Sequence, residues 1–373
     1  MNLIQQFRDI SEHPEIYVRG WKDKNHGRVV GYLCSYVPEE LILAAGALGY
    51  RILGGGHAVS KADAHLQSYS CSLVRGALED ALSGRLDVVD GMVFPHTCDS
   101  IQRLSDIWRM CAPTGFHIDA VLPVCLTTES ARDYMVNICR RLKTDLERHL
   151  KTVIDEERLK AAIETIDGIR IGMEKLYLLR CNHPEQIRGA DFHAIVRASA
   201  IMDRRAFLNI LNGLLADLEM AADVSQLPTV KRLLLSGGAC TFPDVYEIIE
   251  SAGGGVVWDD LCTGGRQWSG RIHAGDDLIA AIADRYMQRP VCPAKHAGLT
   301  CRGDELVRMA KETRSAGVIF LLLKFCDPHA FDYPYLKQRL DAAGIPSLRI
   351  ELEDRLTAEG PLRTRCEAFI EML

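Results

Sequence analysis

Short apolar segments alternate with helical segments in two separate parts of this chain, and this alternation restricts its fold more than any other feature. In the first part, residues 29–33 are apolar and β-rich, and Pro38 then begins a helix whose early acids complement the helix dipole. In the second part, residues 318–325 form a strongly apolar strand, followed by a helix over 331–343. Strands joined by helices run parallel with right-handed crossovers. The pattern therefore predicts an α/β fold with two parallel-sheet lobes.

The two parts also repeat the same landmarks in the same order. Each places a Cys-Asp pair directly after a strand: Cys98-Asp99 follows residues 88–94, and Cys326-Asp327 follows residues 318–325. We expect the two aspartates to cap the helices that come next. The other expected strands are 50–53, 118–124, 232–235, 256–258 and 348–352.

Long helices are expected between the lobes. From about Glu129 to Asp223 the apolar residues keep a helical period, and one stripe runs from Leu159 to Leu179 at spacings of three and four. We therefore divide the chain into a first α/β lobe with an N-terminal lead-in (1–128), a helical segment (129–227) and a second α/β lobe (228–373).

Charge and hydropathy exclude two classes of partner. The formal net charge of -6 gives no basic surface for nucleic acid. The longest apolar stretch, around 318–323, is far shorter than the roughly 20 residues of a membrane-spanning helix. The amino terminus lacks the basic and apolar regions of a signal peptide. We therefore expect a cytoplasmic protein with no nucleic-acid or membrane partner.

In a reducing compartment the 13 cysteines are not a disulfide framework. No Cys-x-x-Cys pair occurs, so a metal cluster would need cysteines that lie far apart in the sequence. Cys98 and Cys326 stand at strand ends, where open parallel sheets bind ligands, and Cys71 stands near a helix start that favours a thiolate. If the lobes face each other across a cleft, these three thiols can hold a [4Fe-4S] cluster with one iron open to substrate. Each thiol can also be a small buried packing residue.

Several motifs carry a family resemblance that spans nearly the whole chain. The chain resembles the subunits of 2-hydroxyacyl-CoA dehydratases and benzoyl-CoA reductases, the 2-hydroxyglutaryl-CoA dehydratase D-component family. The similar blocks, in order, are Gly31-Tyr32-Leu33-Cys34-Ser35-Tyr36-Val37-Pro38-Glu39-Glu40, Pro95-His96-Thr97-Cys98-Asp99-Ser100, Asp259-Asp260-Leu261-Cys262-Thr263-Gly264, Cys292-Pro293, Lys324-Phe325-Cys326-Asp327-Pro328-His329 and Thr364-Arg365-Cys366-Glu367.

The resemblance implies two Rossmann-like lobes facing across a cleft, with a [4Fe-4S] cluster held by Cys71, Cys98 and Cys326. It implies that the cluster passes low-potential electrons to a CoA thioester by ketyl radical chemistry. A homologous second subunit and a separate ATP-dependent activator protein are the implied partners. The chain itself has no Gly-x-x-x-x-Gly-Lys-Ser/Thr loop for ATP, which agrees with a separate activator. Our candidates for proton transfer are Glu40 and His96, which can equally be a helix-start acid and a structural loop histidine.

Two alternatives stay open. The first is a homodimeric reductase of small molecules with a double-cubane [8Fe-9S] cluster. It would need about twice as many cysteine ligands, for which Cys34, Cys240, Cys262 and Cys292 are available. The second is a scaffold subunit that has kept the fold without a cluster.

Overall fold

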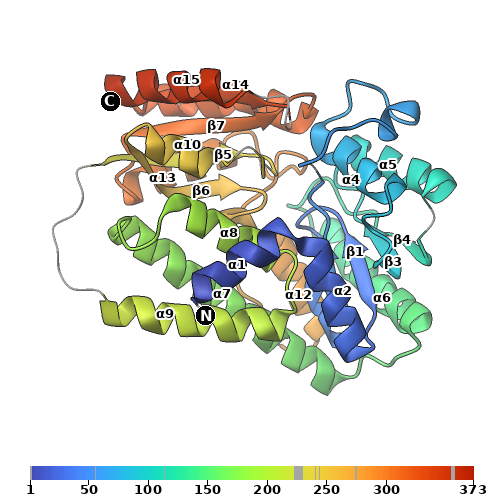
Figure 1. The fold of residues 1–373 in the computed structure, drawn as a ribbon. Helices are drawn as coiled ribbons and strands as arrows, with labels where there is room; N and C mark the ends of the chain where they lie inside the picture. Colours follow the sequence, from blue (N-terminus) through green and yellow to red (C-terminus); the bar gives the residue numbers. More distant parts are fainter. Residues whose placement is uncertain are drawn as a thin grey trace.

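The computed structural model describes residues 2–54, 56–112, 114–221, 230–239, 241–242, 244–273, 275–353 and 358–373. Within these ranges the chain forms two four-stranded parallel sheets surrounded by helices, which confirms the predicted fold class (Figure 1). The first sheet contains β1 (Val29–Tyr32), β2 (Leu48–Arg51), β3 (Gly91–Phe94) and β4 (Phe116–Asp119). The second contains β5 (Lys231–Gly237), β6 (Gly254–Leu261), β7 (Gly317–Leu323) and β8 (Ser347–Leu352).

The two sheets have the same topology. Their strand orders are β2-β1-β3-β4 and β6-β5-β7-β8, so each strand of the first sheet corresponds to the strand four places later in the chain. This confirms the internal repeat that the order of landmarks predicts. Since Cys98 follows β3 and Cys326 follows β7, the two cysteines occupy equivalent positions in the two lobes.

Helices cover both sheets. Those within the first lobe are the 3-10 helix η1 (Ala62–Ala64), α3 (Glu39–Ala44), α4 (Ser72–Leu82) and α5 (Asp99–Cys111). The second lobe has α10 (Val245–Ser251), α11 (Gly265–Trp268), α13 (Cys301–Glu312), α14 (Asp327–Ala342) and α15 (Glu359–Met372).

The predicted helical segment consists of α6 (Glu129–Leu150), α7 (Glu156–Asn182), α8 (Gly189–Ser199) and α9 (Arg204–Ala221). In Figure 1, α7, α8 and α9 lie beneath the second lobe, and α6 lies beside the first. The predicted stripe from Leu159 onward is the buried face of α7. The helix pattern in this part of the sequence is therefore confirmed.

Of three further helices, two pack away from their neighbours in sequence, while α2 (Pro14–Asn25) contributes Val18 to the core of the first lobe. The N-terminal α1 (Leu3–Glu12) and α2 precede the first lobe, yet Phe7 of α1 belongs to the core around the second sheet. Conversely, α12 (Leu278–Gln288) follows β6 but packs on α6 and joins the core of the first lobe. The division at 128 and 227 stays a prediction, and its second boundary lies outside the described residues.

Some strand bounds differ from the prediction for identifiable reasons. The second strand begins at Leu48 because Leu48 pairs with Val29, the first residue of β1, and it ends at Arg51 opposite Tyr32. The seventh strand ends at Leu323, two residues earlier than expected, because Phe325 adopts a left-handed backbone with φ of 62°. Such a backbone turns the chain out of the sheet just before Cys326.

Gly237 lies at the carboxyl end of β5, between β6 and β7, where a side chain has no room. A Cβ at this position would lie 1.9 Å from the carbonyl oxygen of Leu321. We therefore expect Gly237→Ala to lower the free energy of unfolding by about 3 kcal/mol, the upper end of the range for overpacking, as measured by urea denaturation. Gly360→Ala is the matched control, because no heavy atom lies within 4 Å of its added Cβ. Equal stability of the two variants would contradict this packing.

Candidate cofactor site between the two lobes

The three cysteines predicted as ligands each stand at the start of a helix. Cys71, Cys98 and Cys326 are the N-cap residues of α4, α5 and α14. Unpaired amides and the helix dipole make such positions favourable for thiolates and other anions. The prediction that Asp99 and Asp327 cap these helices is wrong, because the cysteines take the cap positions and the aspartates become the first helical residues.

Unusual backbone conformations surround these positions. Cys34, His96 and Phe325 all have positive φ values, between 36° and 62°, although none is a glycine. All three lie in loops that follow β1, β3 and β7 at the carboxyl ends of the strands. Left-handed backbone at non-glycine residues is costly and gathers at functional sites. The backbone of these three loops is consistent with a candidate site, while the other non-glycine residues with positive φ, His26, Lys151 and Arg314, lie elsewhere, the first two as helix C-caps.

The structure brings the thiol of Cys326 into electrostatic range of both Cys71 and Cys98. Burial raises the pKa of the Cys98 thiol to about 12, although a hydrogen bond from the Ile101 amide acts to lower it. The charge of Cys326 adds to the rise. Burial likewise raises the pKa of Cys326, with a contribution from Cys71. Cysteines from both lobes thus meet at this site.

A second set of thiols lies beside the first. The hydrogen bond between Cys34 and Cys262 holds the pKa of Cys262 well below its usual range, assisted by Arg51 and Arg266. Arg51 Nη2 donates to Cys262 Sγ at 3.1 Å, and Ser35 Oγ lies 3.8 Å from the same sulfur. Cys262 is thereby the thiol of this set best prepared to be a thiolate.

Cys292 connects the two sets, because its charge contributes to the raised pKa of Cys34, Cys98 and Cys326. The sequence indicated Cys34, Cys262 and Cys292 as reserve ligands only; Cys240, the fourth reserve, lies outside the described residues. Pairwise electrostatic coupling links three cysteines from each half of the chain, which we call the six-thiol group: Cys34, Cys71, Cys98, Cys262, Cys292 and Cys326.

The donors of the six-thiol group are all thiols, the side chains that hold iron–sulfur clusters in proteins. Among the described residues, no three His, Cys, Asp or Glu side chains are close enough to bind one metal ion. A [4Fe-4S] cluster binds each thiolate through a different iron, so its ligands lie farther apart than those of one ion. A set made of thiols alone, gathered at helix starts, has the chemistry that such a cluster requires.

Buried cations surround the thiols. Arg51 binds Cys262, and Arg266 pairs with Asp260 while its charge acts on Cys262 and Cys292. The ammonium of Lys295 is buried without a hydrogen-bond partner among the described residues. Burial lowers the pKa of Lys295, and the charges of Cys34, Cys292 and Cys98 oppose that shift. These side chains give the site the positive surroundings that an anionic cluster needs.

Glu40, the first candidate for proton transfer, is fully buried in an ion pair. Its Oε1 lies 2.5 Å from Arg170 Nη2 on α7, and its Oε2 accepts from the Tyr286 hydroxyl on α12 at 3.2 Å. These contacts join α3 to two helices and give Glu40 a structural task. Its role as a proton donor stays a prediction.

His96, the second candidate, lies in the loop before Cys98 and is held to β4. Its Nε2 lies 2.7 Å from Asp119 Oδ1. Burial would raise the pKa of Asp119, but hydrogen bonds from His117, Ser105 and His96 hold it well below its usual range. Asp119 therefore remains a carboxylate that fixes the imidazole beside the cysteine loop. The part of His96 in proton transfer also stays a prediction.

A cavity of about 550 Å³ opens beside the cysteine loops and is lined by both halves of the chain. Asp99 and Asp327, which directly follow Cys98 and Cys326, form part of its wall together with Lys295. The remaining wall is largely apolar, with Val124, Leu299, Phe331 and Tyr335 among its residues. The cavity adjoins the cysteine loops through Asp99 and Asp327, although no member of the six-thiol group is among its lining residues.

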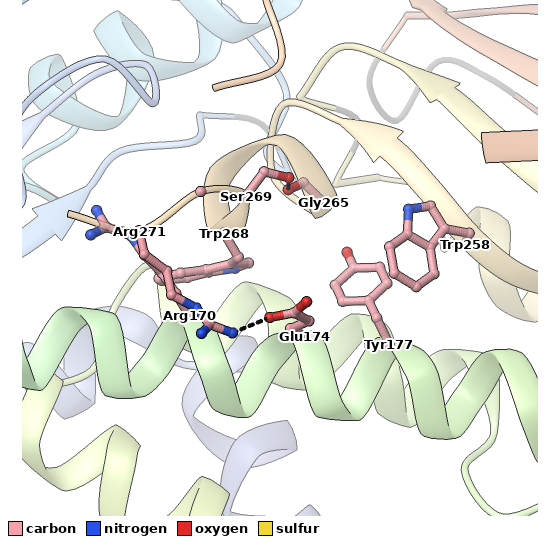
Figure 2. Close-up of a pocket in the computed structure, with 9 residues that line it drawn as sticks. Arg170, Glu174, Tyr177, Trp258, Gly265, Trp268, Ser269 and Arg271 are labelled. Atoms are coloured by element: carbon pink, nitrogen blue, oxygen red, sulfur yellow. Dashed lines mark hydrogen bonds and ion pairs between the residues drawn. The ribbon is translucent and has the colours of Figure 1, made fainter. Parts of the chain in front are cut away.

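A second cavity, of about 280 Å³, lies between α7 and α11 (Figure 2). The rings of Tyr177, Trp258 and Trp268 line it, and Arg271 pairs with Glu174 at 2.6 Å on its rim. It has no cysteine in its wall. This cavity is therefore not the candidate cofactor site.

Comparison with known proteins places the chain in one family. The family described as "2-hydroxyglutaryl-CoA dehydratase, D-component" matches residues 34–373, which include every member of the six-thiol group. The chain belongs to this family. The resemblance that the motifs predict is thereby confirmed.

Individual relatives cover the whole length of the chain. It is 27% identical over 372 residues to the (R)-phenyllactyl-CoA dehydratase beta subunit of Clostridium sporogenes, covering 100% of this chain and 98% of the relative. It is also 27% identical over 363 residues to one subunit of the benzoyl-CoA reductase of Thauera aromatica, covering 95% and 93%. The lactoyl-CoA dehydratase beta subunit of Anaerotignum propionicum is 25% identical over 373 residues, covering 100% and 98%.

The names of these relatives describe subunits of dehydratases and of a reductase. Membership of this family is compatible with the two lobes of equal topology and the cysteines at their strand ends. In the part of the chain that the structure describes, no helix is both long and apolar enough to cross a membrane.

Proposed function

We propose that this chain is the iron–sulfur subunit of a cytoplasmic enzyme that delivers low-potential electrons to an acyl-CoA thioester. The observation that supports the proposal is that Cys71, Cys98 and Cys326 each stand at a helix start, with Cys326 of the second lobe electrostatically coupled to the other two. Two relatives are named for acyl-CoA dehydration and benzoyl-CoA reduction, and both chemistries fit an electron-delivering subunit.

Cys71, Cys98 and Cys326 would hold a [4Fe-4S] cluster, which supplies one electron at low potential when bound. The residues around the cavity would carry out the other tasks. Apolar residues such as Leu299 and Phe331 would seat the acyl group and exclude water. His96, oriented by Asp119, would hold a proton at its ring beside the cysteine loop.

Two protein partners follow from this proposal. The relatives named as beta subunits imply a partner subunit, and we propose that a homologous second subunit pairs with this chain. We also propose a separate ATP-dependent activator protein as the electron donor. The absence of a Gly-x-x-x-x-Gly-Lys-Ser/Thr loop from the sequence supports this division of tasks.

Anaerobic co-purification from the native host tests the proposal. The chain is expected to carry iron and to elute with a second homologous subunit, identified by mass spectrometry. With the activator, ATP and a strong reductant, the complex should convert an aromatic or a 2-hydroxy acyl-CoA, each assayed separately. A colourless, iron-free protein would contradict the proposal and favour a scaffold subunit without a cluster.

The six-thiol group supports a second candidate, a small-molecule reductase with a double-cubane [8Fe-9S] cluster. A cluster held by Cys71, Cys98 and Cys326 alone leaves Cys34, Cys262 and Cys292 without a task. The Cys34–Cys262 hydrogen bond, together with the effect of Cys292 on the pKa values of Cys34, Cys98 and Cys326, supports a role for these thiols in the same site. A larger cluster would use all six.

Cys262→Ala separates the two candidates. If the cluster is a single cube, the variant keeps about four irons per chain, as does the wild type. If it is a double cubane, the wild type carries about eight irons and the variant loses at least half of them. Iron analysis after anaerobic purification measures the difference. Cys366→Ala is the matched control, because Cys366 is buried in the core of the second lobe and should not affect iron content.

A further inference from the structure

Lys295 is an unusual buried cation. Its side chain lies in the loop after Cys292, is only 5% exposed, and its Nζ has no hydrogen-bond partner among the described residues. The Lys295 backbone N–H donates to the carbonyl oxygen of Cys292 at 2.9 Å, so the loop itself is well ordered by hydrogen bonds. Burial of an ammonium without an anionic partner costs several kcal/mol. The position therefore calls for an anion.

The neighbouring arginines differ from Lys295 because each has at least one hydrogen-bond partner, although Arg51 Nε and Arg266 Nη1 have none among the described residues. Arg51 Nη1 donates to the carbonyl oxygen of Cys262 at 3.2 Å, and Arg266 Nη2 donates to the carbonyl oxygen of Gly237. Both thus have backbone partners within the protein. Lys295 lies instead above the ring of Tyr36, with its Nζ 5.9 Å from the ring centroid. An aromatic face offers only a weak attraction and leaves the ammonium hydrogens available.

The surroundings of Lys295 indicate which anion it would meet. The charged groups that act on its ammonium are the thiols of Cys34, Cys292 and Cys98, which come from both halves of the six-thiol group. Lys295 also lines the cavity that opens beside the cysteine loops. Lys295 is therefore a neighbour of both the thiols and the cavity.

We propose that Lys295 donates a hydrogen bond to the iron–sulfur cluster and favours its reduced state. This inference rests on the proposed function, since it requires a bound cluster. A reduced cluster carries one more negative charge than an oxidised one, so a nearby ammonium stabilises the reduced form more. Hydrogen bonds to cluster sulfur act in the same direction. Lys295 would thus raise the reduction potential of the cluster by direct contact with it.

Lys295→Met tests the inference, because methionine keeps the length of the side chain and removes the charge. In a redox titration followed by electron paramagnetic resonance, the variant is expected to show about a tenfold lower ratio of reduced to oxidised cluster at a fixed potential. That ratio corresponds to a midpoint potential lower by about 59 mV for one electron. Lys295→Arg, which keeps the positive charge, should have a midpoint potential close to that of the wild type.

Lys324→Met is the matched control. Lys324 precedes Cys326 by two residues, but its side chain is exposed and pairs with Glu353 at 2.8 Å. Removal of the Lys324 ammonium should leave the midpoint potential of the cluster unchanged. The melting temperature of the iron-free protein provides a second readout: Lys295→Met should melt at or above the wild type, because the variant removes an unpaired buried charge.

The outcomes distinguish the role of Lys295 from the proposed function. An iron-loaded Lys295→Met protein with the wild-type potential would overturn the role of Lys295 and leave the proposed function standing. A Lys295→Met protein that is folded but loses iron, with iron restored in Lys295→Arg, would support the hydrogen bond to the cluster. A wild type that binds no iron would refute the proposed function, and the role of Lys295 with it.

Discussion

Cys98→Ala and Cys326→Ala are each expected to purify without bound iron while the protein stays folded. Both thiols stand at equivalent strand ends and helix starts, one in each lobe, and each lies within electrostatic range of the other. Removal of either leaves a cluster with too few protein ligands. The fold should persist, because neither side chain belongs to the fully buried core of its lobe.

The comparison needs a cysteine outside the six-thiol group. Cys111 serves this purpose, because it ends α5, the helix that Cys98 begins, and its thiol donates to the Ile107 carbonyl oxygen at 3.1 Å. Cys111→Ala should keep its full iron content. Iron and circular dichroism are measured on anaerobically purified protein. A full complement of iron in Cys98→Ala or Cys326→Ala would remove that residue from the ligand set.

Glu40→Ala is expected to lower the free energy of unfolding by about 3–5 kcal/mol. Glu40 and Arg170 form a buried pair, with side-chain exposures of 0% and 3%. Loss of the carboxylate leaves the Arg170 guanidinium in the interior with Asp167 as its remaining ionic partner. The large effect comes from the buried Arg170 Nη2, which loses its carboxylate partner while Asp167 still pairs with Nη1. Equilibrium denaturation in urea measures it.

Glu174→Ala is the control for this prediction. Glu174 also lies on α7 and pairs with an arginine, Arg271, but both side chains are about half exposed. We expect a change of about 0–1 kcal/mol. A loss for Glu40→Ala no larger than that of the control would contradict the structural role. Glu40→Gln addresses the catalytic hypothesis, because a folded but inactive Glu40→Gln protein would support proton transfer by this residue.

Much of the fold was predictable from local sequence patterns. The apolar strands and the helix stripe from Leu159 depend on near neighbours in the chain, and the order of landmarks predicted the repeat that the two sheet topologies confirm. Packing between distant segments was not predictable in this way. Nothing in the sequence of α12 shows that it packs on α6, because an amphipathic helix can bury its apolar face against either lobe.

The same distinction applies to the candidate site. Strand ends and helix starts are visible in the sequence, so Cys71, Cys98 and Cys326 could be selected as candidates. The closeness of Cys34 and Cys262 depends on how the lobes meet, and a single cysteine after a strand carries little signal. Lys295 was missed because an isolated lysine in a loop is usually exposed. Only its burial without a partner among the described residues distinguishes it.

The central claim is that thiols from both lobes bind iron at one place. Anomalous diffraction at the iron absorption edge, from crystals of the anaerobically purified complex, tests it most directly. We predict strong anomalous density bounded by the sulfur atoms of Cys71, Cys98 and Cys326. Well-diffracting crystals of the iron-containing complex with no anomalous density among these three sulfurs would contradict it.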